Sequence, residues 1–376
     1  MKHAFRLLLC CAALLASTSV ASSQIRQAKF YVDGGTGNVT ILNAPTGSGG
    51  GTGTLPSDTG LISFGVGGLP SGSIATFHDD GTHAGYTYAG TRQLVGDGWD
   101  SGTAVPTGEK YATSAALGTN IYVFGGEGAS PYNQVQIYSI TGKAWSSGAA
   151  MPAGVYAATC AIVGANIYVV GGAGTSQSNT VQIYSTAGNS WTAGALMPTG
   201  VSSATCAAVG TNIYVFGGVG TPPYSTVQIY STTGNSWSAG AAIPTGVYAA
   251  MCAAVGTNIY VFGGYQSDTV VQIYSTTGNA WTTGADMPIG KNSATCAAVG
   301  TNIYVFGGSV SSESRVQIYD TKRGSWSTGA AMPIGEYDAT SGALNGKVYV
   351  FGGNASESAN QIYTPASWTS YYSTVN

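Results

Sequence analysis

Few residues of this 376-residue sequence could carry catalytic or metal-binding chemistry, and histidine occurs only three times. The segment His78-Asp79-Asp80-Gly81-Thr82-His83 holds imidazole and carboxylate groups, which are ligands of zinc and copper in proteins. These groups follow no fixed metal-ligand spacing, so His78, Asp79, Asp80 and His83 fit a solvated turn better than a metal site. We therefore predict no metal and no cofactor.

Candidate groups for enzymatic chemistry are isolated from one another. A nucleophilic serine would need a strained turn such as G-x-S-x-G, and the sequence contains none. The carboxylates of Glu109 and Glu336 would suit glycoside chemistry only if their parts of the chain adjoin in space. The sequence therefore favours a protein that is not an enzyme, with catalysis left open.

Four of the six cysteines are evenly spaced: Cys160, Cys206, Cys252 and Cys296 follow one another by 46, 46 and 44 residues. Even spacing places them at equivalent positions of successive repeats. Such positions on neighbouring units should lie farther apart than the ~7 Å between Cα atoms that a disulfide can bridge. We therefore predict four buried free thiols, which behave as small apolar side chains.

Charge is scarce throughout the sequence. Charged residues make up 7% of the chain, against about 25% in an ordinary soluble domain. The net charge is −3 and no basic run occurs. A nucleic-acid-binding protein needs a positive face to neutralise phosphates, so this class is excluded.

The first residues have the pattern of an export signal. Lys2 and Arg6 precede the apolar run 7–16, and Ser19-Val20-Ala21 is a small-residue cleavage pattern. The run is about half the ~20 residues that a membrane-spanning helix needs. We predict a signal peptide over residues 1–21, a secreted or periplasmic protein, and no transmembrane segment. Residues 22–57 form a Gly/Ser/Thr-rich segment.

A repeat of 44 to 46 residues fills most of the chain, marked by (I/V)-Y-V-(F/V)-G-G and by a tryptophan at the same period. Each unit contains four short apolar runs separated by Gly, Asn and Pro turns, which predicts four antiparallel strands. One such sheet cannot bury both of its faces. A closed β-propeller, with Trp and Tyr packed between neighbouring blades, solves this.

The unit resembles the kelch repeat, whose period is near 50 residues. Its signature is a glycine doublet after the second strand, an aromatic residue in the third strand and a tryptophan in the fourth: Gly217-Gly218, Tyr230 and Trp237. The resemblance covers residues 109–372 and implies an all-β propeller of four-stranded antiparallel blades. The regular blades are expected at 109–152, 155–198, 201–244, 247–288, 291–333 and 336–372.

We predict seven blades, with six as the alternative. The additional blade would be a degenerate one at residues 58–106, because Trp99-Asp100-Ser101-Gly102 matches the fourth strand that begins at Trp145. Residues 74–77 align in the same way with residues 121–124. The propeller domain would then span residues 58–376; in the alternative, the N-terminal segment is an appendage.

One face of this propeller should carry the function. The connections from strand 4 to strand 1 and from strand 2 to strand 3 share a face and vary, whereas the turns opposite repeat Gly-Thr-Asn and Thr-Gly-Asn. Function often resides in variable loops on a rigid scaffold, although unconstrained loops vary too. The predicted binding residues on this face are Tyr111, Tyr132, Tyr156, Tyr224, Tyr248, Tyr265, Lys291, Arg315, Glu336 and Tyr337. Plugging of the channel by the tyrosines is the structural alternative.

Neutral polar groups and tyrosines suit sugar stacking or protein anchoring. We therefore expect a monomeric binding module for a glycan or an extracellular protein. The resemblance also implies an enzymatic alternative, because some bacterial kelch propellers are periplasmic sialic-acid mutarotases. Many kelch units carry an arginine before the first strand, which is absent here, and this weakens that alternative. Kelch-like copper oxidases, of the galactose-oxidase type, use two histidines and two tyrosines that have no matching set here.

Overall fold

The computed structural model describes strands at residues 27–32, 39–41, 74–78 and 87–95, and the chain from residue 96 to residue 371 with short gaps. The gaps are residues 129–130, 175, 220–224, 266–267 and 309–312. The chain divides into two compact units, Asp97–Pro365 and Met1–Gly96 with Ala366–Asn376. The predicted signal peptide, Asp79, Asp80, His83 and Tyr224 lie outside the described residues.

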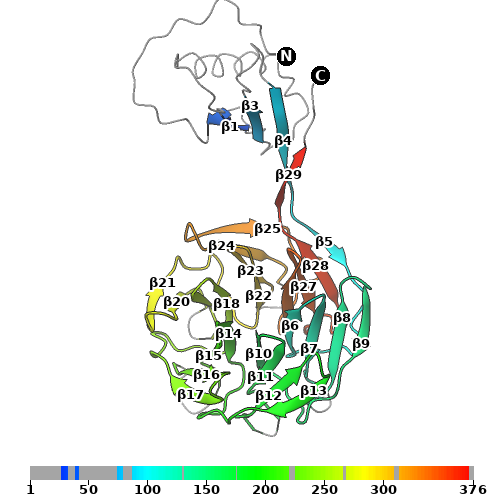
Figure 1. Cartoon of the computed structure of the whole chain (residues 1–376), viewed down its shortest axis with the longest axis vertical. Helices are drawn as coiled ribbons and strands as arrows, with labels where there is room; N and C mark the ends of the chain where they lie inside the picture. The colour runs from blue at the N-terminus through cyan, green and yellow to red at the C-terminus, as the bar shows by residue number, and fades with distance from the viewer. Residues whose placement is uncertain are drawn as a thin grey trace, which may run out of the picture. The chain divides into compact units, whose positions relative to one another are not determined.

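The larger unit is a propeller of six four-stranded antiparallel blades around a central axis (Figure 1). Blade 1 consists of β6 (Thr113–Leu117), β7 (Asn120–Phe124), β8 (Val135–Ser139) and β9 (Ala144–Ser147). Blade 2 consists of β10 (Thr159–Val163), β11 (Asn166–Val170), β12 (Val181–Ser185) and β13 (Ser190–Ala193). Blade 3 consists of β14 (Thr205–Val209), β15 (Asn212–Phe216), β16 (Val227–Ser231) and β17 (Ser236–Ala239).

The second half of the ring repeats this arrangement. Blade 4 consists of β18 (Met251–Val255), β19 (Asn258–Phe262), β20 (Val271–Ser275) and β21 (Ala280–Thr283). Blade 5 consists of β22 (Thr295–Val299), β23 (Asn302–Phe306), β24 (Val316–Asp320) and β25 (Ser325–Gly329). Blade 6 consists of β26 (Thr340–Leu344), β27 (Lys347–Phe351), β28 (Asn360–Thr364) and β5 (Gly98–Ser101).

Blade 6 closes the ring with a strand from the other end of the chain. β5 pairs with β28 in the register Tyr363–Trp99 that the other blades use for their own Tyr–Trp pairs. The six-bladed alternative is therefore the observed one. The strand at Trp99, expected to complete an additional blade, is the outer strand of blade 6.

The smaller unit contains a five-stranded antiparallel sheet with the order β2-β1-β3-β4-β29. Its strands are β1 (Gln27–Val32), β2 (Val39–Ile41), β3 (Ile74–His78), β4 (Thr87–Val95) and β29 (Ser367–Tyr371). β29 carries Trp368 and was expected as the outer strand of the last blade, but it pairs with β4. β3 lies between β1 and β4, not in a kelch-like meander.

Aromatic side chains fill the space between neighbouring blades, as the sequence predicted. Phe124 of blade 1 meets Tyr184 and Trp191 of blade 2, with ring centroids 5.8 Å apart in both pairs. The indole N–H of Trp191 also donates to the carbonyl of Ala149 in blade 1, at 2.8 Å. All six blades repeat this bond, including Trp99 to Ala330. Each blade is thus fastened to the preceding one around the whole ring.

The glycine doublet fastens neighbouring blades closer to the axis. In blade 2 the N–H of Gly172 donates to the carbonyl of Val201 in blade 3, at 2.8 Å. A Cβ on the first glycine, Gly171, would lie 2.6 Å from the same carbonyl oxygen. The equivalent donor–acceptor pairs are Gly126–Val155, Gly218–Val247, Gly264–Lys291, Gly308–Glu336 and Gly353–Glu109. Close backbone approach therefore explains why the doublet recurs.

A buried glutamine in the third strand fixes the connection that enters each blade. In blade 3 the Gln228 amide accepts from the N–H of Thr199 and donates to its carbonyl, at 2.9 and 3.0 Å. The equivalent glutamines are Gln136, Gln182, Gln272, Gln317 and Gln361. This role was not predicted, although Gln follows the first residue of the third strand in every unit.

Candidate functional site

The 4-to-1 and 2-to-3 connections lie together on one face of the propeller, which we call the mouth face. Bridges join them within single blades, as between Lys110 and Glu127 and between Tyr248 and Tyr265. The turns between strands 1 and 2 and between strands 3 and 4 form the opposite face, which we call the turn face. This division matches the prediction.

A ring of six residues surrounds the axis at the mouth face, and we call it the annulus. Each residue donates its N–H to the carbonyl of the annulus residue in a neighbouring blade, at 2.8 to 2.9 Å, so the ring closes on itself. All six have positive φ, between 50° and 57°, although none is glycine. The members are Tyr111, Ala157, Ser203, Ala249, Ser293 and Asp338.

Four of the six annulus residues are polar, and three of them, on adjoining blades, form a hydrogen-bonded cluster. The Asp338 carboxylate accepts hydrogen bonds from the hydroxyls of Ser293 and Tyr111 on the two neighbouring blades. Burial raises the pKa of Asp338, and burial together with the Asp338 charge raises the pKa of Tyr111. Tyr111 therefore stays protonated as a donor. The cluster is a fixed set of hydrogen-bonding groups, and it holds no activated nucleophile.

The predicted tyrosines gather around this ring. Tyr156 lies 6.3 Å from Tyr111 between ring centroids. Tyr248 and Tyr265 stack at 4.7 Å with 12° between their planes, and Tyr265 is 45% exposed. Tyr337 contacts the side-chain amide of Asn354 through its hydroxyl. Tyr132 is half-buried within its own 2-to-3 connection. Two pairs of the predicted tyrosines therefore lie against each other on the mouth face, Tyr111 with Tyr156 and Tyr248 with Tyr265.

Buried charged residues mark three adjoining blades. Glu109, Lys291 and Glu336 occupy equivalent positions before the first strand and are only 1 to 2% exposed. Blades 2, 3 and 4 place Val155, Val201 and Val247 at this position. Burial raises the pKa of Glu109 to about 8 and that of Glu336 to about 7. Burial also lowers the pKa of Lys291.

Each of these charges is engaged within its own blade. Glu109 accepts from the Gln136 amide at 3.1 Å, and Glu336 accepts from the N–H groups of Ala355 and Ser356. Lys291 pairs with Glu313 at 3.3 Å, and the exposed Arg315 lies 3.8 Å from the other Glu313 oxygen. None of these contacts joins the side chains of Glu109, Lys291 and Glu336 to one another. The blades that carry Glu109 and Glu336 do adjoin, as the glycoside alternative requires, but each carboxylate is bonded within its own blade.

The four evenly spaced cysteines are free, as predicted, but only Cys206 is a buried residue and the other three are partly exposed. They lie on adjacent inner strands, and hydroxyls of the preceding blade contact three of them, as Thr113 contacts Cys160 at 3.2 Å. Burial raises the pKa of Cys160 and of Cys296 to about 12 and raises that of Cys206 and Cys252 as well.

We expect none of these four thiols to react with a water-soluble disulfide reagent at pH 8, because the reactive thiolate is suppressed. Labelling the native protein and mapping the modified peptides by mass spectrometry checks this for each cysteine. Labelling in guanidinium chloride should modify all four. Rapid modification of any of them in the native protein would contradict the expectation.

Metal and membrane signals are absent from the residues that the structure describes. Among them, no group of three or more His, Cys, Asp or Glu side chains could hold a metal ion. No helix of this part of the chain is long and apolar enough to cross a membrane. Of the weak metal candidates, only the backbone of His78 is described, in β3.

The fold and the repeat signature define a six-bladed kelch-type propeller. The family model described as the KLHDC2/KLHL20/DRC7 Kelch-repeats domain matches residues 98–264 and 203–375. The chain therefore belongs to the kelch-repeat family, whose propellers are commonly interaction modules. No curated protein matches it.

Sequence reasoning missed two members of the polar cluster, Ser293 and Asp338, as binding residues. Both residues belong to the hydrogen-bonded annulus, whose members all have positive φ. A repeat in the sequence does not reveal the φ of its residues. The one available signal was that Asp338 is the only acidic residue at this position of the repeat.

Proposed function

We propose that this chain is an exported binding module that holds a partner protein against its mouth face. Export rests on the signal-like residues 1–21. Recognition by this face rests on its exposed apolar side chains, its tyrosines and the partly exposed charges Lys110 and Glu127 of blade 1 and Arg315 of blade 5.

The observation that carries the proposal is the distribution of exposed large hydrophobic residues. Among the described residues these are Leu196, Tyr265 and Ile334. All three lie in 4-to-1 or 2-to-3 connections, and the turn face carries none of them. They lie on different blades, and what favours an interface is their confinement to one face together with the aromatic residues there, a residue type enriched at protein interfaces.

A neutral glycan is the second candidate for the same face. The stacked pair Tyr248 and Tyr265 supports it, because an exposed tyrosine ring can stack on a sugar. Binding of the full chain to arrays of extracellular proteins and of neutral glycans would separate the two candidates.

Replacing both Tyr248 and Tyr265 by alanine is expected to weaken binding to the partner at least about tenfold, because central aromatic anchors dominate interfaces. A titration by surface plasmon resonance or calorimetry measures the change. The control is Thr257→Ala on the turn face, which should bind like the wild type. Equal affinity of the double variant and the control would refute the assignment of the mouth face.

A further inference from the structure

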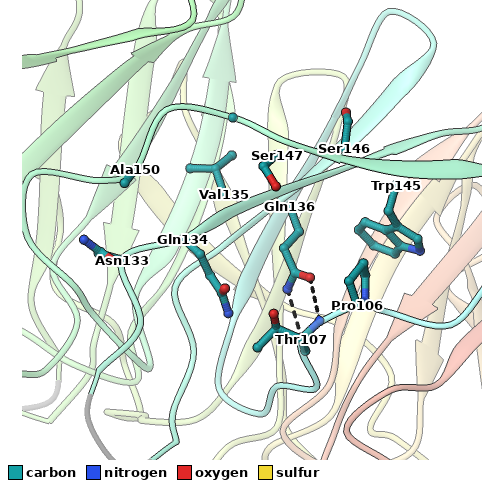
Figure 2. Close-up of a pocket in the computed structure, with 11 residues that line it drawn as sticks. Pro106, Thr107, Asn133, Gln134, Val135, Gln136, Trp145, Ser146, Ser147 and Ala150 are labelled. Carbon is teal, nitrogen blue, oxygen red and sulfur yellow. Dashed lines mark hydrogen bonds between the residues drawn. The ribbon is translucent and has the colours of Figure 1, made fainter.

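A cavity of about 380 Å³ lies where the chain enters blade 1, toward its outer strands (Figure 2). One wall is the connection at Pro106 and Thr107. The others are residues 133–136, which lead into β8, and residues 145–150 in and after β9. This volume is within the range of small-molecule sites, about 300 to 1,000 Å³.

The wall at Thr107 is rigid because the Gln136 amide is fully used. Its oxygen accepts from the Thr107 N–H, and its nitrogen donates to the Thr107 carbonyl, both at 3.0 Å (Figure 2). The same nitrogen donates to Glu109 at 3.1 Å. Gln136 therefore shapes the cavity and has no N–H left for a ligand.

Gln134 provides the donor that is still open. Its side-chain nitrogen is buried and has no hydrogen-bond partner. In Figure 2 the Gln134 side chain extends toward the Thr107 segment, alongside Gln136. Because leaving a buried donor unpaired costs about 1 to 3 kcal/mol, rotation of this amide toward a ligand acceptor in the pocket would be favoured.

The remaining lining offers an aromatic ring and hydroxyls without charge. The indole N–H of Trp145 is bonded to the carbonyl of Thr103 at 2.9 Å, and the ring packs against Tyr138 and Phe351 at 5.0 and 5.3 Å between centroids. Only the rest of the ring surface lines the pocket. Ser146, Ser147 and Asn133 add polar groups. None of the lining residues is charged. An aromatic ring, amides and hydroxyls around a small neutral cavity suit a ligand with one apolar face and several hydroxyls.

We propose that this cavity binds a neutral pyranose sugar, whose hydroxyl accepts from Gln134 and whose apolar face packs on Trp145. The site lies beyond the annulus and its tyrosines, so it adds to the proposed function and does not depend on it. Blades 2 and 3 have Thr180 and Thr226 in place of Gln134, and blades 4, 5 and 6 have Val270, Arg315 and Ala359. Only blade 1 therefore offers the amide donor at this position.

The test is a titration of the full chain with the methyl pyranosides of glucose, galactose, mannose and N-acetylglucosamine, followed by saturation-transfer NMR. At least one should bind saturably with a Kd of about 1 mM. Gln134→Thr, which copies blades 2 and 3, should weaken this binding at least about tenfold. Ala150→Leu, which copies the exposed Leu196 of blade 2, should also weaken it by narrowing the entrance of the pocket.

The controls separate this site from the mouth face. Thr226→Ser in blade 3 and the double variant of Tyr248 and Tyr265 should leave the sugar affinity unchanged. Unaltered thermal midpoints would show that the blade 1 variants remain folded. The proposal is overturned if no pyranoside saturates, or if Gln134→Thr and Ala150→Leu bind like the wild type.

Discussion

Replacing Gly171 by alanine is expected to destabilise the propeller by about 3 kcal/mol or more. Gly171 has φ of +67°, where an L side chain costs about 1 to 2 kcal/mol. The new Cβ would also meet the carbonyl oxygen of Val201 at 2.6 Å. That carbonyl accepts the hydrogen bond from Gly172 that joins blades 2 and 3, so relief of the collision weakens this bond, which is worth about 1 kcal/mol.

The matched control is Gly164→Ala in the same blade. Gly164 has φ of +62°, but a Cβ there would meet nothing within 4 Å. It should cost only about 1 kcal/mol, the left-handed penalty less the entropy that glycine loses on folding. Urea denaturation of both variants measures the difference. Equal destabilisation would show that φ alone, and not contact between blades, requires the doublet.

Replacing Glu109 by valine is expected to stabilise the protein at pH 9 by about 2 to 5 kcal/mol. Glu109 is 1% exposed and one of its carboxyl oxygens has no hydrogen-bond partner. Blades 2, 3 and 4 already fold with valine at this position, so the side chain should fit. Removal of the buried carboxyl ends the cost of ionising it.

The sign of the effect depends on pH. The pKa of Glu109 is raised by burial from 4.5 to about 8, so the folded protein keeps a proton that the unfolded chain loses between these values. The contribution of Glu109 to wild-type stability should therefore fall as the pH rises from 4.5 to 8, by up to about 1.4 kcal/mol per pH unit, and level off above pH 8. Below pH 4.5 the contribution of Glu109 is at its most favourable.

Thermal denaturation of wild type and Glu109→Val between pH 4 and pH 9 tests this expectation. The variant should show a flatter profile, and its advantage should grow as the pH rises. Glu357→Gln, at an exposed position, is the control and should follow the wild-type profile. Parallel profiles for wild type and Glu109→Val would mean that Glu109 ionises freely in the folded protein.

These variants bear on why the charges are present at all. Val155, Val201 and Val247 show that a blade needs no charge at this position. The buried carboxyls of Glu109 and Glu336 therefore carry an ionisation cost that the blade architecture does not require, and with Lys291 they lie on three adjoining blades. Ionisable groups kept in costly environments are concentrated at functional sites. This favours a role for the mouth face of blades 5, 6 and 1. Because the three side chains are buried, recognition by charge would fall to exposed neighbours such as Arg315.

The repeat itself could be predicted from the sequence, because its causes are local or periodic. Strand lengths follow from apolar runs between turns. A tryptophan equivalent to Trp191 recurs in every repeat because each junction between blades needs an aromatic side chain packed into it. Free thiols followed from the spacing of Cys160 and its counterparts. The division into a variable and an invariant face followed from the alternation of strand direction.

Ring closure could not be predicted, because two segments compete for one place. Trp99 and Trp368 both fit the tryptophan period. Trp99 comes just before the first regular repeat, and Trp368 comes at the end of the last one. Pairing of β5 with β28 joins residues more than two hundred positions apart, and local pattern does not rank such pairings. The same limit hid the Ser293–Asp338–Tyr111 cluster, which forms only when three blades meet.

The sequence by itself determined the kelch blade, the number of regular units and the positions of the aromatic wedges, since each depends on contacts within a unit or on its repetition. Tertiary structure alone decided that the ring closes with six blades and that the six annulus residues adopt positive φ. It also decided that Glu109, Lys291 and Glu336 are buried, each in a different blade. These features depend on packing between blades, where backbone approach and burial are set by residues distant in the chain.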